Sequence, residues 1–328
     1  MTMKANLTLF QSFPRFDGEP KIWTATALAI AILALSFAPI LIRFSEHDLG
    51  PYGTVFNRFW IASLALVLGN QSVKLWGRIR NHESPSKARE QYTVQDFVYL
   101  AIGTSLDSLS FVTWTWSLSK TTVANASLLH NTTPIFAVLG GYLFLNQTFG
   151  RGFLMGTSLS LGGVILIGLE DFHISQETLV GDGSALLSAF LYASIFLVTE
   201  QLRKKFDAGT ILLWYSSLSS LFLLPWVLIF EDQLFPQSLS GWAAVSGLGL
   251  FCTVIGAGAL FYSLKHLSSG FVSLVMLLKS VLAAMLAWII FGESLSWLSG
   301  LVFVCVLSGI YLANSDYISK ESDVPELS

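Results

Sequence analysis

Long apolar runs joined by short polar links dominate the pattern of the chain. About ten stretches hold enough consecutive apolar residues, roughly 20 each, for a helix to cross a lipid bilayer. They cover residues 22–42, 51–70, 96–117, 122–145, 152–169, 181–201, 209–230, 241–264, 270–291 and 295–314. The links at 118–121 and 292–294 are very tight and force neighbouring helices to run antiparallel. The pattern predicts an all-α integral membrane protein, with a bundle of about ten transmembrane helices.

Composition supports a membrane protein and excludes several classes of function. Hydrophobic residues make up 53% of the 328 positions and charged residues only 12%, whereas soluble domains carry roughly 25% charged residues. The net charge of −3 comes without a basic cluster, so nucleic acid is not an expected partner. Cys252 and Cys305 each lie inside an apolar run, where thiols are typically small apolar fillers and not disulfides or metal ligands.

The distribution of Lys and Arg predicts the orientation of the helices. With the N-terminus inside, most of the 18 basic residues fall in cytoplasmic segments, and only Arg43 and Lys120 fall outside. Cytoplasmic segments of membrane proteins carry such an excess. The pattern therefore predicts cytoplasmic tails at 1–21 and 315–328, with an even number of helices between them. The first apolar run lacks the features of a cleaved signal peptide and is expected to stay as a helix.

The two halves of the helical region resemble each other at an offset of 146 residues. Trp116-Ser-Leu aligns with Tyr262-Ser-Leu, Phe144-Leu-Asn-Gln with Ile290-Phe-Gly-Glu, and Gly163 with Gly309. This offset pairs two five-helix repeats, 22–169 and 181–314. Because five is odd, the second repeat enters the membrane from the opposite side. Inverted repeats are typical of transporters, with a substrate site near the midplane and alternating access.

Two charged residues lie in the middle of predicted helices, where charge is costly and commonly functional. Lys279 is predicted either to contact an anionic or carboxylate-bearing substrate or to pair with a carboxylate of the bundle. Asp107 is either a proton-coupling carboxylate or the counter-ion of Lys279 or Arg58. Arg58 itself lies nearer a helix end, which favours a role at the interface or in bracing the bundle.

The fourth predicted helix carries a polar stripe. Ser127, His130, Asn131 and Pro134 share one helical face. Polar groups facing lipid would lack hydrogen-bond partners, so this face should turn inward. It forms either one wall of a polar cavity or a set of satisfied packing contacts. The predicted substrate-binding residues are Lys279, His130, Asn131 and Asp107, in a cavity between helices three, four, eight and nine.

No signature of an enzyme is present. The sequence lacks a nucleophile elbow, a phosphate-binding loop and a paired-histidine metal motif, so we expect no catalytic residues, no cofactor and no bound metal. The glycines of helix eight (Gly247, Gly249, Gly256 and Gly258) lack the strand–turn–helix context of a nucleotide site. Small residues of this kind let transmembrane helices approach closely.

Several segments of the sequence resemble the drug/metabolite transporter superfamily, and most closely its EamA-like permeases. The resemblance lies in the segments Pro134–Gln147 and Lys279–Glu293, in the glycines that follow each of them, and in Asn57-Arg58-Phe59. Two positions depart from the family pattern: Asn146-Gln147 stands where Gly-Glu is usual, and Ser280 where Pro is usual. Lys279 falls where the sugar-phosphate and nucleotide-sugar branch carries a lysine associated with phosphate.

The resemblance implies ten helices, a central cavity, and export or exchange of small metabolites. We expect a secondary or facilitative transporter in the plasma (bacterial inner) membrane that works by alternating access. Its expected partners are the bilayer and a small-molecule substrate. A homodimer and a coupling proton stay open as further partners. The alternative is a membrane scaffold or sensor that keeps the fold without transporting.

Overall fold

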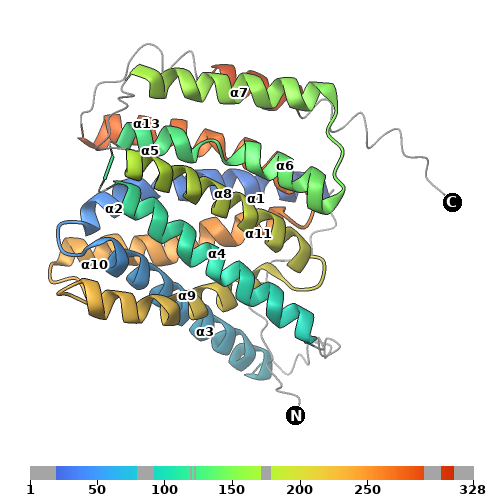
Figure 1. Cartoon of the computed structure of the whole chain (residues 1–328). Coiled ribbons are helices and arrows are strands. Elements are labelled where there is room, and N and C mark those ends of the chain that lie inside the picture. Colours follow the sequence, from blue (N-terminus) through green and yellow to red (C-terminus); the bar gives the residue numbers. More distant parts are fainter. Residues whose placement is uncertain are drawn as a thin grey trace. The chain divides into compact units, whose positions relative to one another are not determined.

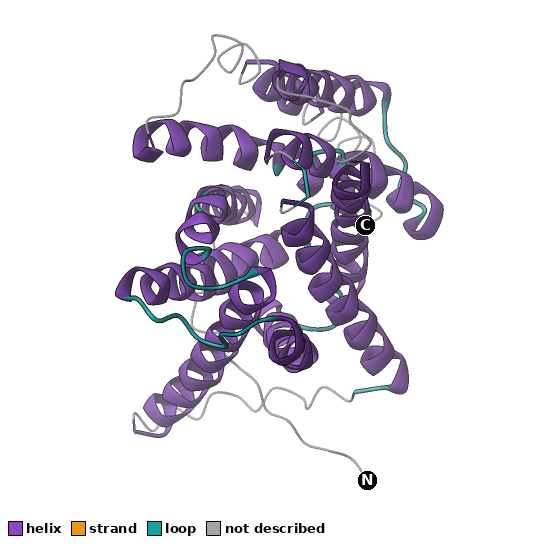
Figure 2. Ribbon diagram, turned by 60° about the vertical axis from the view of Figure 1, so that its left-hand side comes forward, coloured by secondary structure: helices purple, strands orange, loops and turns teal. Residues whose placement is uncertain are grey.

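The computed structural model describes residues 20–79, 92–118, 120–121, 123–170, 179–291 and 304–313, and its regular structure there is entirely helical (Figures 1 and 2). The first helices are α1 (Pro20–Ser36), α2 (Ala38–Ser45), α3 (Pro51–Ile79), α4 (Val94–Leu118), α5 (Val123–His130), α6 (Thr133–Leu145) and α7 (Arg151–Glu170). They are followed by α8 (Leu179–Leu202), α9 (Ala208–Phe230), α10 (Leu239–Ser246), the π-helix η2 (Gly247–Ala257), α11 (Gly258–Ser263), α12 (Ser269–Val275), α13 (Leu277–Phe291) and a helix at Val304–Ala313. Apart from Pro20 and Lys21, the predicted tails lie outside the described residues, as does the link at 292–294.

Each predicted transmembrane segment contains helix within the described residues, which confirms the all-α class. Within the part of the chain that the structure describes, six helical stretches are long and apolar enough to cross a membrane: Ile22–Ser45, Val94–Ser117, Leu179–Leu202, Ala208–Phe230, Leu239–Ser263 and Ser269–Ile290. Thr133–Leu145 and Val304–Ala313 are shorter apolar helices.

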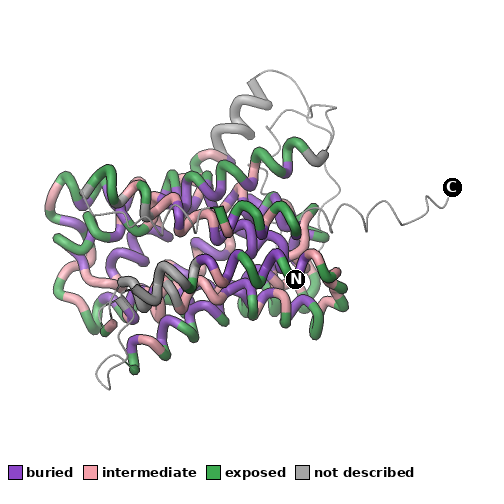
Figure 3. Tube along the Cα trace, turned by 90° about the horizontal axis from the view of Figure 1, so that it is seen from above, coloured by how far each residue is buried: buried purple, intermediate pink, exposed green. Residues whose placement is uncertain are grey.

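Large apolar side chains cover the outside of these helices. Along the tube in Figure 3, exposed and buried positions alternate within single helices. Phe144 is 77% exposed and Ile229 72% exposed. Soluble monomers rarely expose contiguous apolar surface on this scale, whereas lipid tails are a suitable solvent for it.

Three predicted helices are interrupted, which the apolar pattern alone did not predict. The breaks fall at Phe37, at Asn131–Thr132 and at Met276. The first two precede a proline at the start of the next helix, Pro39 in α2 and Pro134 in α6. Proline lacks the N–H that would continue the preceding helix and restricts the residue before it. The break at Met276 has no such proline, since Ser280 occupies the position that corresponds to Pro134.

The chain divides into two compact units that do not coincide with the two sequence repeats. One unit comprises 1–108 and 198–266, and the other 109–197 and 267–328. Each unit therefore takes helices from both repeats. The boundaries fall inside α4 and α8, so these two helices contribute residues to both units.

In the first unit, α3 packs against α9 and η2, and α1 packs against η2 and α11. The hydroxyls of Ser63 and Ser217 are 2.7 Å apart. Towards the start of α3, the Tyr52 N–H donates to Glu231 Oε1 at 2.6 Å. Residue numbers thus rise along α3 as they fall along α9, so these two helices run antiparallel. They are the second and seventh of the predicted transmembrane helices. Corresponding helices of an inverted repeat have this relation.

In the second unit, α7 and the helix Val304–Ala313 show the repeat directly. Ser160 Oγ donates to the carbonyl oxygen of Val306 at 3.3 Å, and these residues are 146 positions apart, the offset found in the sequence. Gly156, one turn earlier, lies against Ala313, so this pair is also antiparallel. Equivalent residues of the two repeats touch each other here, which places the local symmetry axis between these helices.

The contact between α2 and α10 in the first unit depends on one carboxylate. Asp48 Oδ2 accepts hydrogen bonds from the Ser238 N–H at 2.8 Å and from the Ser238 hydroxyl. Ser238 in turn caps α10 through Gly241. These hydrogen bonds lower the pKa of Asp48 below its ordinary value of 3.8.

We predict that Asp48→Asn lowers the thermal stability of the protein at neutral pH, because an amide is a weaker acceptor than a carboxylate. A carboxyl group whose pKa is lowered by folding stabilises the fold above its unfolded pKa and loses that effect as pH falls through the folded value. The melting temperatures of the variant and the wild type should therefore converge below about pH 4. A constant difference from pH 7 to pH 3 would contradict the assignment.

The crossing of α7 with Val304–Ala313 requires glycine at Gly156. A methyl group there would lie 2.2 Å from the carbonyl oxygen of Gly309. We predict that Gly156→Ala costs about 1–3 kcal/mol of unfolding free energy through overpacking, measured by denaturant unfolding in detergent. Gly162→Ala on the same helix is the control, because a methyl group there meets nothing within 4 Å. Equal effects of the two substitutions would refute the close crossing.

Candidate functional site

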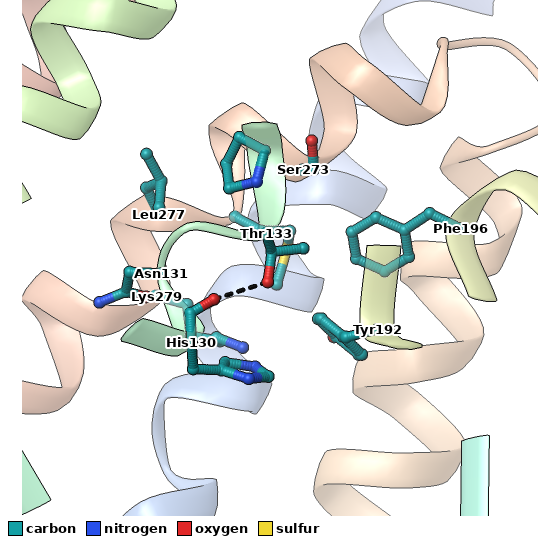
Figure 4. Close-up of a pocket in the computed structure, with 10 residues that line it drawn as sticks. His130, Asn131, Thr133, Tyr192, Phe196, Ser273, Leu277 and Lys279 are labelled. Carbon is teal, nitrogen blue, oxygen red and sulfur yellow. Dashed lines mark hydrogen bonds between the residues drawn. The ribbon is translucent and has the colours of Figure 1, made fainter. Parts of the chain in front are cut away.

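A pocket in the second unit brings together three of the four predicted site residues (Figure 4). Its lining comes from the breaks α5/α6 and α12/α13 and from α8. The lining residues are His130, Asn131, Thr133, Pro134, Tyr192, Phe196, Ser273, Met276, Leu277 and Lys279. The pocket therefore joins helices four, six and nine, whereas the cavity predicted from the sequence used helices three, four, eight and nine.

Two of the three broken helices meet at this pocket. α5 ends at His130 and α6 begins at Thr133, while α12 ends at Val275 and α13 begins at Leu277. Irregular backbone at membrane depth is tolerated only where protein covers it or where it lines a cavity. In transporters, discontinuous helices in corresponding positions of two repeats point to the binding site.

Repeat-equivalent residues face each other across the pocket. His130 corresponds to Met276, Asn131 to Leu277 and Thr133 to Lys279, each at the 146-residue offset seen between Ser160 and Val306. The Ser280 hydroxyl donates to Asn131 Oδ1 at 2.7 Å.

A second contact fixes the direction of these two helices. A methyl group at Gly270 would touch the Val138 side chain at 3.4 Å. With Asn131 beside Ser280, residue numbers rise along α6 as they fall along α12 and α13. The pocket thus lies between two antiparallel copies of one broken helix, with different chemistry on the two copies.

Lys279 places a positive charge at the pocket. Its Nζ lies 5.1 Å from the centre of the Tyr192 ring, within the range of a cation–π interaction. Among the residues that the structure describes, none that lines the pocket is Asp or Glu. An aromatic face stabilises an ammonium group without neutralising it, so this contact is compatible with an additional anionic ligand.

His130 lies among aromatic rings and one hydroxyl. Its ring centre is 4.5 Å from that of Trp114 and 5.3 Å from that of Tyr192. Its Nδ1 lies 2.9 Å from Ser188 Oγ. The ring is therefore oriented from α4 and α8, although it comes from α5.

The fourth predicted residue, Asp107, belongs to the first unit and is not among the lining residues. Asp107 is 7% exposed and Arg58 4% exposed, and the charge of Arg58 acts on Asp107. Arg58 Nε donates to Thr253 Oγ1 in η2 at 2.7 Å. Burial of Arg58 decides between the two roles considered for it, because a buried guanidinium braces the bundle and does not reach the interface.

Three residues of α8 that line or support the pocket were not predicted from the sequence. Ser188, Tyr192 and Phe196 recur every four residues, so they share one helical face. That spacing was the available signal. It was not recognised because tyrosine and phenylalanine in a transmembrane helix are more commonly packing or interface residues.

The comparison with known families settles what kind of protein this is. The model of the EamA-like transporter family matches residues 22–169 and 179–315. The chain belongs to the EamA-like transporter family. It is therefore a multi-pass membrane transporter and not an enzyme, and its two family domains confirm the duplicated architecture of this EamA-like protein.

Individual relatives agree with the family. An uncharacterized transporter of Archaeoglobus fulgidus is 26% identical over 299 residues, covering 89% of this chain and 97% of that protein. The pseudopaline exporter CntI of Pseudomonas aeruginosa is 22% identical over 188 residues, covering 57% of this chain and 64% of its own. A crystal structure superimposes with a TM-score of 0.72 at 15% identity, covering 89% of this chain and 97% of that one. That likeness shows the fold alone.

Proposed function

We propose that this EamA-like transporter exports or exchanges small anionic or carboxylate-bearing metabolites, and that Lys279 contacts their negative group. The observation that carries the proposal is a lysine on an aromatic ring, in a pocket that is lined, as far as the structure describes the chain, by polar, aromatic and apolar residues without an acid. A charge within the membrane is costly, and such charges commonly mark functional sites. A substrate anion would make a charge-assisted contact with Lys279 during transport.

The neighbouring groups support this class of substrate. Asn131 Oδ1 already accepts from Ser280, which leaves the amide hydrogens of Asn131 as donors. An ammonium group and an amide N–H₂ together suit a carboxylate or a phosphate. A relative named as an exporter supports export as the direction.

Alternating access is the proposed mechanism. The pocket lies between equivalent broken helices of two antiparallel repeats, the arrangement in which rocking of one part exposes a fixed site to each side in turn. Transport would be secondary or facilitative. We place the protein in a plasma (bacterial inner) membrane with both termini cytoplasmic, on the distribution of Lys and Arg. A homodimer stays a prediction.

We predict that Lys279→Met abolishes exchange of anionic solutes in counterflow assays with proteoliposomes. The panel holds sugar phosphates, carboxylates, amino acids and neutral sugars. Loss of the Lys279 ammonium group should reduce exchange at least about a hundredfold, the cost expected for a charge-assisted hydrogen bond to a substrate. Lys279→Arg should keep part of the activity.

Lys265→Met is the matched control, because Lys265 is exposed at the end of α11 and does not line the pocket. It should exchange solutes like the wild type. If Lys279→Met folds and exchanges anions at the wild-type rate, Lys279 is structural and the proposed substrate class is wrong. Exchange of neutral solutes alone would also exclude that class.

We propose that Asp107 serves mainly as the counter-ion of Arg58 and not as the proton-coupling carboxylate. The support is the charge of Arg58 acting on Asp107, with Arg58 held in place by Thr253. Removing one partner of a buried charge pair leaves the other charge uncompensated.

Asp107→Asn and Arg58→Gln should therefore each lower unfolding free energy by about 3–5 kcal/mol, and the double variant should cost less than the sum of the two. Denaturant unfolding of the four proteins in detergent measures this coupling. A stable Asp107→Asn protein that exchanges solute but no longer accumulates it under a pH gradient would instead identify Asp107 as the coupling group.

A further inference from the structure

Ser188 fixes the hydrogen-bonding state of His130. The Ser188 hydroxyl donates to the carbonyl oxygen of Ala185 in its own helix at 2.7 Å. The same oxygen lies 2.9 Å from Nδ1 of His130. A serine hydroxyl has one proton and two acceptor lone pairs. With that proton directed at Ala185, the partner at 2.9 Å supplies its own proton, so His130 Nδ1 is the donor.

The other ring nitrogen of His130 is then an acceptor. In a neutral imidazole, one nitrogen carries the proton and the other carries a lone pair, and the partner of one nitrogen determines the state of the other. Lys279 lines the same pocket, and because like charges repel, its ammonium group favours the neutral form of the ring. Nε2 has no hydrogen-bond partner among the residues that the structure describes.

The position of Ser188 is itself anchored. Its backbone carbonyl accepts a hydrogen bond from Ser110 Oγ at 3.2 Å, and Ser188 is fully buried. Trp114, on α4 with Ser110, packs against the His130 ring. The ring therefore has little freedom to turn over and exchange its two nitrogens.

We infer that Ser188 is a positioning residue that makes His130 present an acceptor to the pocket, so that the pocket selects anions carrying a hydrogen-bond donor, such as a hydroxyl, beside their negative group. The inference rests on the proposed function, because Lys279 and Asn131 would hold the negative group. His130 Nε2 would accept the adjacent O–H or N–H. An anion with only acceptors cannot form this hydrogen bond, and its lone pairs would repel the lone pair of Nε2.

The first experiment measures the tautomer without any ligand. Protein labelled with ¹⁵N-histidine is studied by two-bond ¹H–¹⁵N correlation NMR in detergent, and His130 is assigned from the spectrum of His130→Gln. The wild type should show protonated Nδ1 and unprotonated Nε2. Ser188→Ala should lose this preference, whereas Ser194→Ala should not. Ser194, also on α8, makes the same kind of hydrogen bond, to the carbonyl oxygen of Phe190 in its own helix, and it does not line the pocket.

The second experiment compares matched acids as ligands. Lactate and pyruvate, and likewise malate and oxaloacetate, have nearly the same size and charge, but only the first of each pair has a hydroxyl donor. Inhibition of counterflow exchange should favour the hydroxy acids by about tenfold, the value of one hydrogen bond. Ser188→Ala should bring the ratio near one, and Ser194→Ala should leave it unchanged.

The outcomes separate this inference from the proposed function. A protonated Nε2 in the wild type, or a tautomer unchanged in Ser188→Ala, overturns the role of Ser188. Equal inhibition by both members of each pair, or inhibition by neither, overturns the donor selectivity. Neither outcome bears on the role of Lys279, because that role is tested separately with Lys279→Met on the whole solute panel.

Discussion

Lipid offers no hydrogen bonds, and the rest of this structure depends on that constraint. A backbone in the hydrocarbon region must satisfy its own N–H and C=O groups, so all the regular structure of the described chain is helical. Where a helix breaks, the freed groups must be enclosed by protein or line a polar cavity. The breaks at Asn131–Thr132 and Met276 both adjoin the pocket. The constraint that forces the helices thus also limits where a binding site can lie.

The two units accommodate charged side chains within predicted transmembrane helices in different ways. Lys279 lies on the face of Tyr192, where a quadrupole stabilises the ammonium and leaves its net charge in place. Arg58 instead combines a fixed hydrogen bond to Thr253 with the opposite charge of Asp107. The first arrangement places an ammonium group at the pocket, while the second joins a guanidinium group to a hydroxyl and an opposite charge inside the other unit. This contrast is the physical reason for assigning substrate contact to Lys279 and bracing to Arg58.

At the pocket, the two copies of the broken helix have similar backbones but different side chains. The positions of His130 and Asn131 correspond to Met276 and Leu277, so one copy of the broken helix is polar where the other is apolar. Duplication supplies the antiparallel frame, and divergence of the two copies supplies a pocket with distinct sides. A ligand held there would have one orientation.

The sequence predicted the helices and the polar stripe well, because both depend on local patterns. His130 and Asn131 were grouped by helical spacing, and Lys279 by the cost of its charge. Asp107 was selected by the same cost, yet it belongs to the other unit, because cost alone does not say which charges meet. Ser188 and Tyr192 were missed because their importance comes from contacts with His130 and Lys279. The break at Met276 was not predicted because no proline marks it. The π-helix at Gly247–Ala257 was not predicted because its glycines are its strongest local signal.

The interleaving of the two repeats has a consequence for biosynthesis. The first unit needs residues 198–266 to complete it, so α3 emerges from the ribosome long before its partner α9. Five helices must wait in the bilayer, or be held by other proteins, until the second copy is made. The second unit is completed only when residues beyond 267 are inserted. Neither gene half, expressed alone, would contain a complete unit, even though each half matches a whole family domain.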